Sequence, residues 1–221
     1  VCSSDLAQMR IPYAVIYSAA FRESGADGLA REREVLALAR SAGVRLIGPN
    51  CLGVVNVPDS VYAAFGSMSR EPRLKPGSVS VVSQSGGFGY SIVLRCAAAG
   101  IGFRYLVSSG NEIDVTTPGL IDAYLDDPGT TTVIAYVEGL ADGRALLEAG
   151  RKAGRLGKAI LLWKAGNSEE GRRAAASHTG NMTGSYDIYR GLMRQAGIVE
   201  IRSFEEAAEL VKAFSSSRRP R

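Results

Sequence analysis

The single histidine of the chain, His178, is the residue best suited to carry chemistry. It lies in residues 174–180, Ala-Ala-Ala-Ser-His-Thr-Gly, after an apolar run at 159–163 and a turn rich in Gly, Ser and Glu. An imidazole can serve as a general base, as a metal ligand or as a nucleophile that accepts a phosphoryl group. A lone histidine on a loop can also be inert, so the residues that the fold brings near it decide between these alternatives.

A glycine-rich turn and one carboxylate suit a histidine that carries a phosphoryl group. Residues 83–87, Ser-Gln-Ser-Gly-Gly, open a predicted helix, and the N–H groups and positive dipole end of a helix start bind anions. Glu138 closes the apolar run 133–137, and its carboxylate can hold one imidazole nitrogen of His178 and leave the other nitrogen as the nucleophile. Each signal has an ordinary alternative, a passive strand-to-helix turn and a solvent-facing carboxylate at a strand end.

Other chemistries fit the residue pattern less well. A Ser/His/Glu hydrolase needs its serine in a Gly-x-Ser-x-Gly turn, whereas Ser85 lies in Ser-Gln-Ser-Gly-Gly. A phospho-aspartate receiver needs acidic residues at the ends of the first and third strands, where Glu138 stands alone. With one histidine and no clustered acids, we expect no metal site.

The composition is that of a globular chain with a mild positive charge. The 221 residues predict one or two domains, and no apolar run reaches the roughly 18–20 residues of a membrane span. The net charge is +4, but the aromatic residues (7%) do not interleave with the arginines, so we expect no nucleic-acid partner. Three cysteines without metal-like spacing, and the lack of a secretory signal, predict a cytoplasmic protein.

The predicted elements divide the chain into two parts. The first part, 1–58, is predicted as strand, helix, strand and loop at 13–17, 29–42, 44–47 and 48–53. This βαβ fragment is too short to be a domain, so we interpret it as the last part of a parallel α/β domain whose beginning is missing. Residues 1–6 fit nothing that follows and are treated as a sequence artefact.

The second part, 77–215, follows a predicted linker at 59–76 that contains a strand at 61–65, and it precedes a basic tail at 216–221. Strands are predicted at 79–83, 103–107, 132–137, 159–163 and 198–201, and helices at 87–99, 117–125, 142–155, 169–177, 186–196 and 204–214. Near-continuously apolar strands that alternate with helices are typical of a parallel sheet covered on both faces. This predicts an α/β, flavodoxin-like domain with a five-stranded parallel sheet in the order 2-1-3-4-5.

The predicted topology brings the unusual residues to one edge. Ligands of such sheets bind beyond the carboxyl ends of the strands. The turn 83–87 follows the first strand, Glu138 follows the third, and Lys164 with the segment leading to His178 follows the fourth. We therefore expect the functional site at this edge.

Five motifs occur in the order and at the separations of a known family. They are Gly48-Pro-Asn-Cys-Leu-Gly53, Val82-Ser-Gln-Ser-Gly-Gly87, Ser109-Gly-Asn111 followed by Asp114-Val115, Tyr136-Val-Glu-Gly139 and Ser177-His-Thr-Gly180. With these motifs the chain after Leu6 resembles the NDP-forming acyl-CoA synthetases, the superfamily of ADP-forming acetate–CoA ligase and the succinyl-CoA ligase α subunit. The resemblance implies a succinyl-CoA synthetase-like flavodoxin domain preceded by the end of a Rossmann-like CoA-binding domain.

The resemblance also implies an acid–thiol ligase that interconverts carboxylate, CoA and ATP with acyl-CoA, ADP and phosphate. Acyl-CoA and phosphate exchange to acyl phosphate and CoA, and the acyl phosphate then phosphorylates His178, which Glu138 steadies. The phosphohistidine in turn phosphorylates ADP at an ATP-grasp domain. The other residues that match the family motifs are Ser85, Gly86 and Gly87 for the phosphate, Asn50 and Asn111 for the CoA and acyl region, and Cys51, to which no nucleophilic role is assigned.

The sequence differs from the family in two missing segments and one altered motif. The glycine-rich turn of the CoA-binding domain and the ATP-grasp domain are not present, and Asn181-Met-Thr-Gly184 stands where Ala-Leu-Ala-Gly often follows the histidine. We therefore expect ATP or ADP with Mg to bind an ATP-grasp domain or β subunit, and this fragment to hold no cofactor tightly and to be inactive alone. The whole enzyme is expected to be a homo- or hetero-oligomer that acts on CoA and a small carboxylic acid, with the acyl group left open.

An alternative to the ligase is a non-catalytic CoA-sensing module, such as the related domain fused to protein acetyltransferases. Such a module needs no phosphorylatable histidine. The presence of both His178 and Glu138 favours the enzyme.

Overall fold

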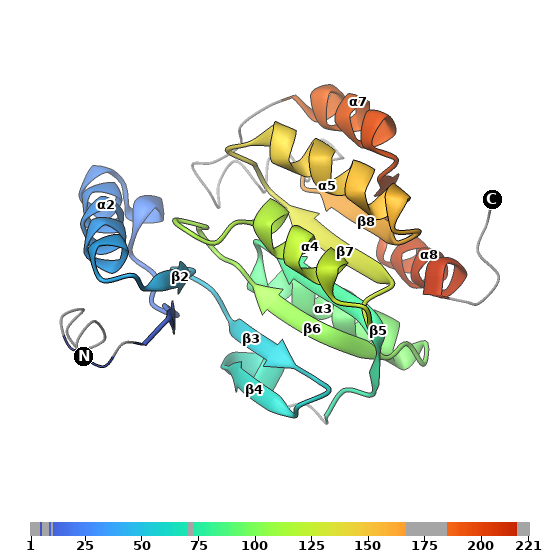
Figure 1. Ribbon diagram of the computed structural model, residues 1–221, viewed down its shortest axis with the longest axis horizontal. Helices are drawn as coiled ribbons and strands as arrows, with labels where there is room; N and C mark the ends of the chain where they lie inside the picture. The colour runs from blue at the N-terminus through green and yellow to red at the C-terminus, as the bar shows by residue number, and fades with distance from the viewer. Residues whose placement is uncertain (1–4, 6–8, 10, 70–72, 167–184, 216–221) are drawn as a thin grey trace.

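Strands that are apolar on both faces build the centre of the protein (Figure 1). The computed structural model describes residues 5, 9, 11–69, 73–166 and 185–215. Its parallel strands are β5 (Pro76–Ser83), β6 (Phe103–Ser108), β7 (Thr132–Val137), β8 (Ala159–Lys164) and β9 (Val199–Glu200). They lie in the order β6-β5-β7-β8-β9, which confirms the predicted 2-1-3-4-5 order of a flavodoxin-like sheet.

Helices cover both faces of this sheet, as its apolar strands require. α4 (Thr117–Asp126), α5 (Gly143–Arg155) and α7 (Tyr186–Ala196) lie side by side on the face that is in front in Figure 1. α3 (Gly86–Ala98) and α8 (Phe204–Ser215) pack together on the opposite face. These helices were expected from the sequence, while the helix predicted at 169–177 lies outside the described residues.

Alternate residues of each strand enter two separate hydrophobic cores. In β7, Ile134 and Tyr136 belong to the core beneath α3 and α8, whereas Val133, Ala135 and Val137 belong to the core beneath α4, α5 and α7. All five side chains are buried. Burial of an aliphatic side chain contributes about 1.5–3 kcal/mol, so the two cores fix the strand ends from which the loops of the site project.

Two antiparallel strands extend the sheet beyond β6. β3 (Gly53–Asn56) pairs with β6 on one side and with β4 (Val61–Ala64) on the other, so the sheet has seven strands in the described part of the chain. β4 confirms the strand expected at 61–65, and the short 3-10 helix η2 (Gly66–Ser69) follows it. The sequence does not predict β3, because its four residues, Gly-Val-Val-Asn, are too few to show a strand period.

The N-terminal part is a small βαβ unit beside the main sheet (Figure 1). Strands β1 (Tyr13–Val15) and β2 (Arg45–Ile47) are parallel and are joined through the 3-10 helix η1 (Arg22–Ser24) and helix α2 (Ala26–Ser41). Ala39, Val44 and Leu46 form its buried core. The predicted strand–helix–strand order is thus confirmed, while the domain boundaries at 58 and 77 stay a prediction. Within the described residues, no helix is long and apolar enough to cross a membrane.

Candidate functional site

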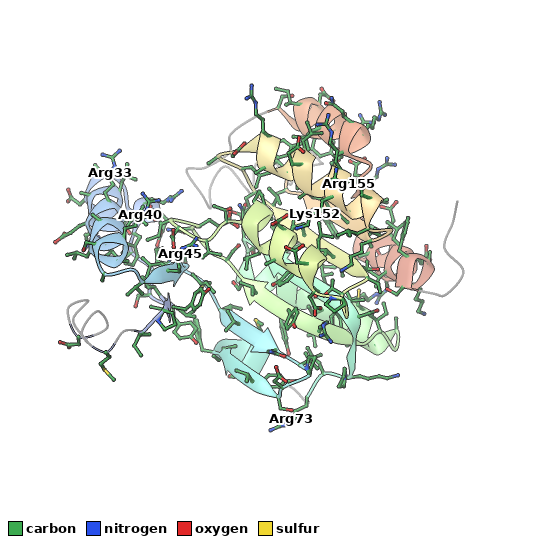
Figure 2. The ribbon with its side chains drawn as sticks, viewed as in Figure 1. Arg33, Arg40, Arg45, Arg73, Lys152 and Arg155 are labelled. Atoms are coloured by element: carbon green, nitrogen blue, oxygen red, sulfur yellow. The ribbon has the colours of Figure 1, made fainter. Side chains whose placement is uncertain are left out.

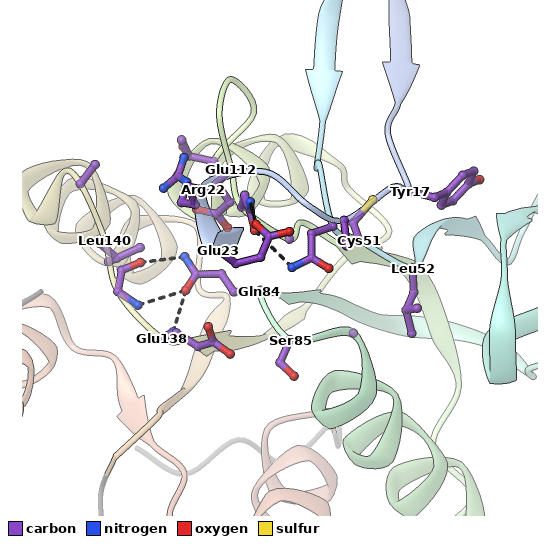
Figure 3. A pocket seen from close by; sticks show the side chains of 18 of the residues that line it. Tyr17, Arg22, Glu23, Cys51, Leu52, Gln84, Ser85, Glu112, Glu138 and Leu140 are labelled. Carbon is purple, nitrogen blue, oxygen red and sulfur yellow. Dashed lines mark hydrogen bonds between the residues drawn. The ribbon is translucent and has the colours of Figure 1, made fainter. Parts of the chain in front are cut away.

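A cavity of about 850 Å³ lies at the carboxyl ends of β5, β6 and β7 (Figure 3). The turns that follow these strands form one side of it, and the N-terminal unit with residues 50–52 forms the other. Sequence-predicted residues in its lining are Asn50, Ser85, Gly86, Gly87, Asn111 and Glu138. The structure therefore brings the expected residues that it describes to one edge of the sheet.

The start of α3 supplies the anion-binding character of the cavity. Ser85 is the N-cap of the helix, and its Oγ accepts a hydrogen bond from the Phe88 N–H at 3.4 Å. The N–H groups of a first turn have no acceptor within their own helix, and at the start of α3 Gly86 and Gly87 line the cavity. A Cβ on Gly86 would lie 2.4 Å from Leu52 Cγ, so the absence of a side chain lets Leu52 pack against the helix start.

Glu138 follows β7 and is half-buried at the same end of the cavity (Figure 3). The negative charge of its carboxylate acts on two neighbours. Burial lowers the pKa of Lys164, and the Coulombic effect of Glu138 partly offsets that shift. Burial, followed by the charge of Glu138, raises the pKa of Tyr136 to about 12. A carboxylate and a helix start within one cavity can hold an imidazole and an anion together.

Asn50 and Asn111 join the two sides of the cavity through their side chains. Asn50 Nδ2 donates to Asn111 Oδ1 at 3.4 Å. Asn111 Nδ2 donates to Glu23 Oε2 at 2.8 Å and to Glu32 Oε1 at 2.7 Å. Both the oxygen and the nitrogen of the Asn111 amide therefore bond to protein groups, which favours a bracing role for this residue in the cavity wall.

A half-buried ion pair that contacts Asn111 was not expected from the sequence. Glu32 is only 3% exposed, and its carboxylate accepts hydrogen bonds from Arg22 Nε at 2.7 Å and 3.0 Å. The signal was nevertheless present, because Glu32 has helical spacing with Val35, Leu36 and Ala39 and so falls on the inward face of the helix. A charged residue at such a position indicates a buried partner.

The loop after β6 attaches the N-terminal unit to the main sheet. Its main chain donates hydrogen bonds to the carbonyls of Pro49, Gly48 and Leu46. Asp114 adds a carboxylate that accepts from Arg45 Nε at 2.7 Å and from the Leu46 N–H at 2.9 Å. Burial alone would raise the pKa of Asp114, but these hydrogen bonds outweigh burial and lower it. The cavity thus owes its shape to contacts between two parts that are distant in sequence.

We expect Gly110→Ala to disrupt this attachment. Gly110 has φ +61°, and a Cβ there would lie 2.2 Å from the Pro49 carbonyl oxygen and 2.6 Å from that of Asn50. Gly197 is a matched control, because its φ is +67° but a Cβ there meets nothing within 4 Å. Left-handed backbone alone costs about 1–2 kcal/mol, so Gly197→Ala should lose about that much in denaturant unfolding. Gly110→Ala should lose at least about twice as much, since rigid backbone must move. Equal losses would contradict the argued contact.

Cys51 also lines the cavity, as a buried thiol. Burial raises the pKa of the Cys51 thiol to about 11. The thiolate is the nucleophilic form of cysteine, and little of it exists near neutral pH at such a pKa. The geometry therefore gives no support to a nucleophilic role.

Two further expectations from the sequence concern His178 and the lack of a metal site. His178 lies outside the described residues. Among the residues that are described, no group of three or more His, Cys, Asp or Glu side chains could hold a metal ion. The described part of the site therefore consists of Glu138, the start of α3 and the hydrogen-bonded residues around Asn111.

The fold and the site define a class of domain. The family described as succinyl-CoA ligase like flavodoxin domain matches residues 76–214, a stretch that starts at the first residue of β5 and ends in α8. This range includes the turn at the start of α3, Glu138 and the position of His178. The chain belongs to this family of α/β domains.

Its similarity to proteins of known activity is more specific. The chain is 36% identical over 201 residues to subunit alpha of ADP-forming acetate–CoA ligase II of Pyrococcus furiosus, covering 91% of this chain and 43% of that subunit. It is 37% identical over 193 residues to ADP-forming acetate–CoA ligase I of Archaeoglobus fulgidus, covering 87% of this chain and 27% of that enzyme. Dinucleotide-forming acetyl-coenzyme A synthetase 1 of Ca. Korarchaeum cryptofilum, solved with phosphate and ADP, has a TM-score of 0.87 and 34% identity, covering 96% of this chain and 45% of that one.

The chain is thus a member of the NDP-forming acyl-CoA synthetases. It spans less than half the length of each of these relatives. The relatives reported above are ligases and synthetases, and they give no support to the alternative of an acetyltransferase-fused sensing module.

Proposed function

We propose that this chain is the phosphohistidine-bearing part of an ADP-forming acyl-CoA synthetase of the acetate–CoA ligase type. The observation that carries the proposal is the shared cavity, which is lined by the start of α3 and by Glu138. His178 is the proposed phosphoryl carrier, as the only histidine of the sequence.

The proposed reaction proceeds by three exchanges. Phosphate attacks the acyl carbonyl of acyl-CoA, the C–S bond breaks, and acyl phosphate and CoA form. An imidazole nitrogen of His178 then attacks the phosphorus, the P–O bond to the acyl group breaks, and the carboxylate leaves. Finally, the phosphohistidine passes its phosphoryl group to ADP and gives ATP. Each exchange is reversible, so the same site can activate a carboxylate with ATP.

The residues of the cavity have separate proposed roles. The Glu138 carboxylate accepts a hydrogen bond from one imidazole nitrogen of His178, which leaves the lone pair of the other nitrogen free to attack phosphorus. The N–H groups at the start of α3 stabilise the phosphoryl oxygens, with Ser85, Gly86 and Gly87 as the proposed binding residues. Asn50 lies near the CoA and acyl groups in this proposal, and Asn111 braces the wall behind it.

The partners follow from the same scheme. CoA and a small carboxylic acid are the proposed substrates, and an ATP-grasp domain or β subunit is the proposed site of ATP or ADP. Magnesium is assigned to that part together with the nucleotide, whose phosphate oxygens are the ligands that it prefers. We propose an oligomeric enzyme in the cytoplasm, a compartment that suits the unpaired Cys51 and Cys96.

A labelling experiment tests the proposal. The complete protein is incubated with acetyl phosphate labelled in its phosphoryl group, and the protein-bound label is then exposed to acid and to base. Phosphohistidine is lost in acid and survives in base, so this pattern of stability is the expected result. No label, or label that survives acid, would overturn the proposed function.

A further inference from the structure

The Gln84 side chain forms hydrogen bonds with the main chain of both Glu138 and Gly139 (Figure 3). Gln84 Oε1 accepts from the Glu138 N–H at 2.6 Å and from the Gly139 N–H at 3.1 Å. Gln84 Nε2 donates to the Gly139 carbonyl oxygen at 2.7 Å. Both the oxygen and the nitrogen of the Gln84 amide thus bond to the turn that carries the proposed catalytic carboxylate.

The main chain of Gln84 continues the same connection. Its N–H donates to the Tyr136 carbonyl oxygen at 3.1 Å, next to the last paired residues of β5 and β7. From the far side, Lys164 Nζ donates to the Glu138 carbonyl oxygen at 2.8 Å. Both the N–H and the C=O of Glu138 are therefore held, although the ladder between β5 and β7 ends before this residue.

Gln84 is also the residue before Ser85, the N-cap of α3. It therefore links two parts of the cavity that come from different strands, the anion-binding helix start after β5 and the carboxylate after β7. A catalytic carboxylate must be held within roughly 0.5 Å of its working position to orient an imidazole well. A rigid amide that is hydrogen-bonded to the carboxylate's own backbone meets that requirement.

We propose that Gln84 is a positioning residue that sets the place of Glu138 relative to the start of α3. The inference rests on the proposed function, since it gives Gln84 its role through the carboxylate that holds His178. Gln84 does not touch the reacting atoms in this scheme. Its loss should slow phosphoryl transfer to the histidine while the binding of acetyl phosphate by the helix start changes little.

The test measures phosphohistidine formation from labelled acetyl phosphate in the complete protein, in a single turnover. Gln84→Met keeps the length of the side chain and removes all three hydrogen bonds. We expect the rate at saturating acetyl phosphate to fall about tenfold or more, and the concentration for half-maximal rate to change less than about twofold. Gln84→Asn, whose amide is too short to reach both N–H groups, is a second variant that keeps the turn polar and should show the same split.

Ser80→Ala is the matched control for a purely structural effect. Ser80 Oγ and Thr130 Oγ1 are 2.8 Å apart in a buried hydrogen bond that also connects β5 to the segment before β7, away from the cavity. Its loss should lower thermal stability without slowing phosphoryl transfer. The decisive comparison repeats Gln84→Met in a Glu138→Gln background, where a residue that acts through Glu138 should have an effect of less than about twofold.

The outcomes separate this inference from the proposed function. If the wild-type protein takes up the label and both Gln84 variants take it up at the wild-type rate, the positioning role alone is overturned. An equal loss of rate with and without the Glu138 carboxylate would have the same consequence. A wild-type protein that takes up no acid-labile label would overturn the proposed function, and the positioning role with it.

Discussion

His178→Ala is expected to abolish the acid-labile label that the complete protein takes up from acetyl phosphate. The substitution removes the only histidine of this sequence and with it the proposed nitrogen nucleophile. No neighbouring side chain can replace it, because the hydroxyl groups of Ser177 and Thr179 would give phosphate esters that are stable in acid. The loss should be complete, at least about a thousandfold in single-turnover labelling, since removal of a covalent nucleophile leaves only binding and electrostatic effects.

Two further measurements make the His178 result specific. Thr179→Val changes the adjacent position and should leave labelling within about threefold of wild type, which controls for damage to this stretch of chain. Thermal unfolding should be unchanged in His178→Ala, so that a lost fold cannot explain lost label. Persistence of acid-labile label in His178→Ala would show that another residue carries the phosphoryl group.

Much of the fold follows from the sequence because its dominant signals are local. Buried parallel strands such as β7 and β8 are continuous apolar runs, and the helices between them show clear apolar spacing and capping residues such as Ser85 and Asp142. Given that order of elements, the rule that ligands bind at the carboxyl ends of the strands brings Glu138 and the start of α3 together. The cavity confirms this placement for the residues that the structure describes.

The rest of the site depends on contacts between distant residues, which local patterns do not contain. β3 forms because β6 offers it a partner, and its four residues alone give no strand signal. The pairing of Asn111 with Glu32 joins residues 79 positions apart. Gln84 lies within one of the five motifs, but only the structure shows that its amide bonds to the main chain of Glu138 and Gly139.

These long-range contacts also explain why both parts of the chain are needed for the cavity. The βαβ unit contributes Arg22 and Glu23 to the lining, and the main sheet contributes the start of α3 and Glu138. Hydrogen bonds join the two parts at the cavity, because Asn111 from the loop after β6 donates to Glu23 and to buried Glu32 of the βαβ unit, where Glu32 also pairs with Arg22. Separating the two parts would remove the Asn111 hydrogen bonds to Glu23 and Glu32, together with those from the loop after β6 to the carbonyls of residues 46, 48 and 49. The cavity is therefore a property of the joined parts.

Glu138→Gln is expected to slow phosphorylation of His178 by acetyl phosphate about a hundredfold, or about 2.7 kcal/mol in the barrier. A neutral amide keeps the size of the side chain and its main-chain bonds to Gln84 and Lys164, so the turn should stay in place. What is lost is the negative charge that stabilises the imidazole as it becomes positive on attacking phosphorus. Single-turnover labelling at saturating acetyl phosphate measures this step directly.

Asp142→Asn provides the matched control for Glu138→Gln. Asp142 lines the same cavity, and its Oδ1 caps α5 by accepting from the Arg144 N–H at 2.8 Å. Asparagine caps a helix about as well as aspartate does, so this variant loses one negative charge from the cavity without losing the helix start. Its labelling rate should stay within about threefold of wild type. If both variants slow labelling equally, the effect belongs to the overall charge of the cavity and the specific role of Glu138 is wrong. If only Glu138→Gln does so, the carboxylate at the end of β7 acts on the histidine itself.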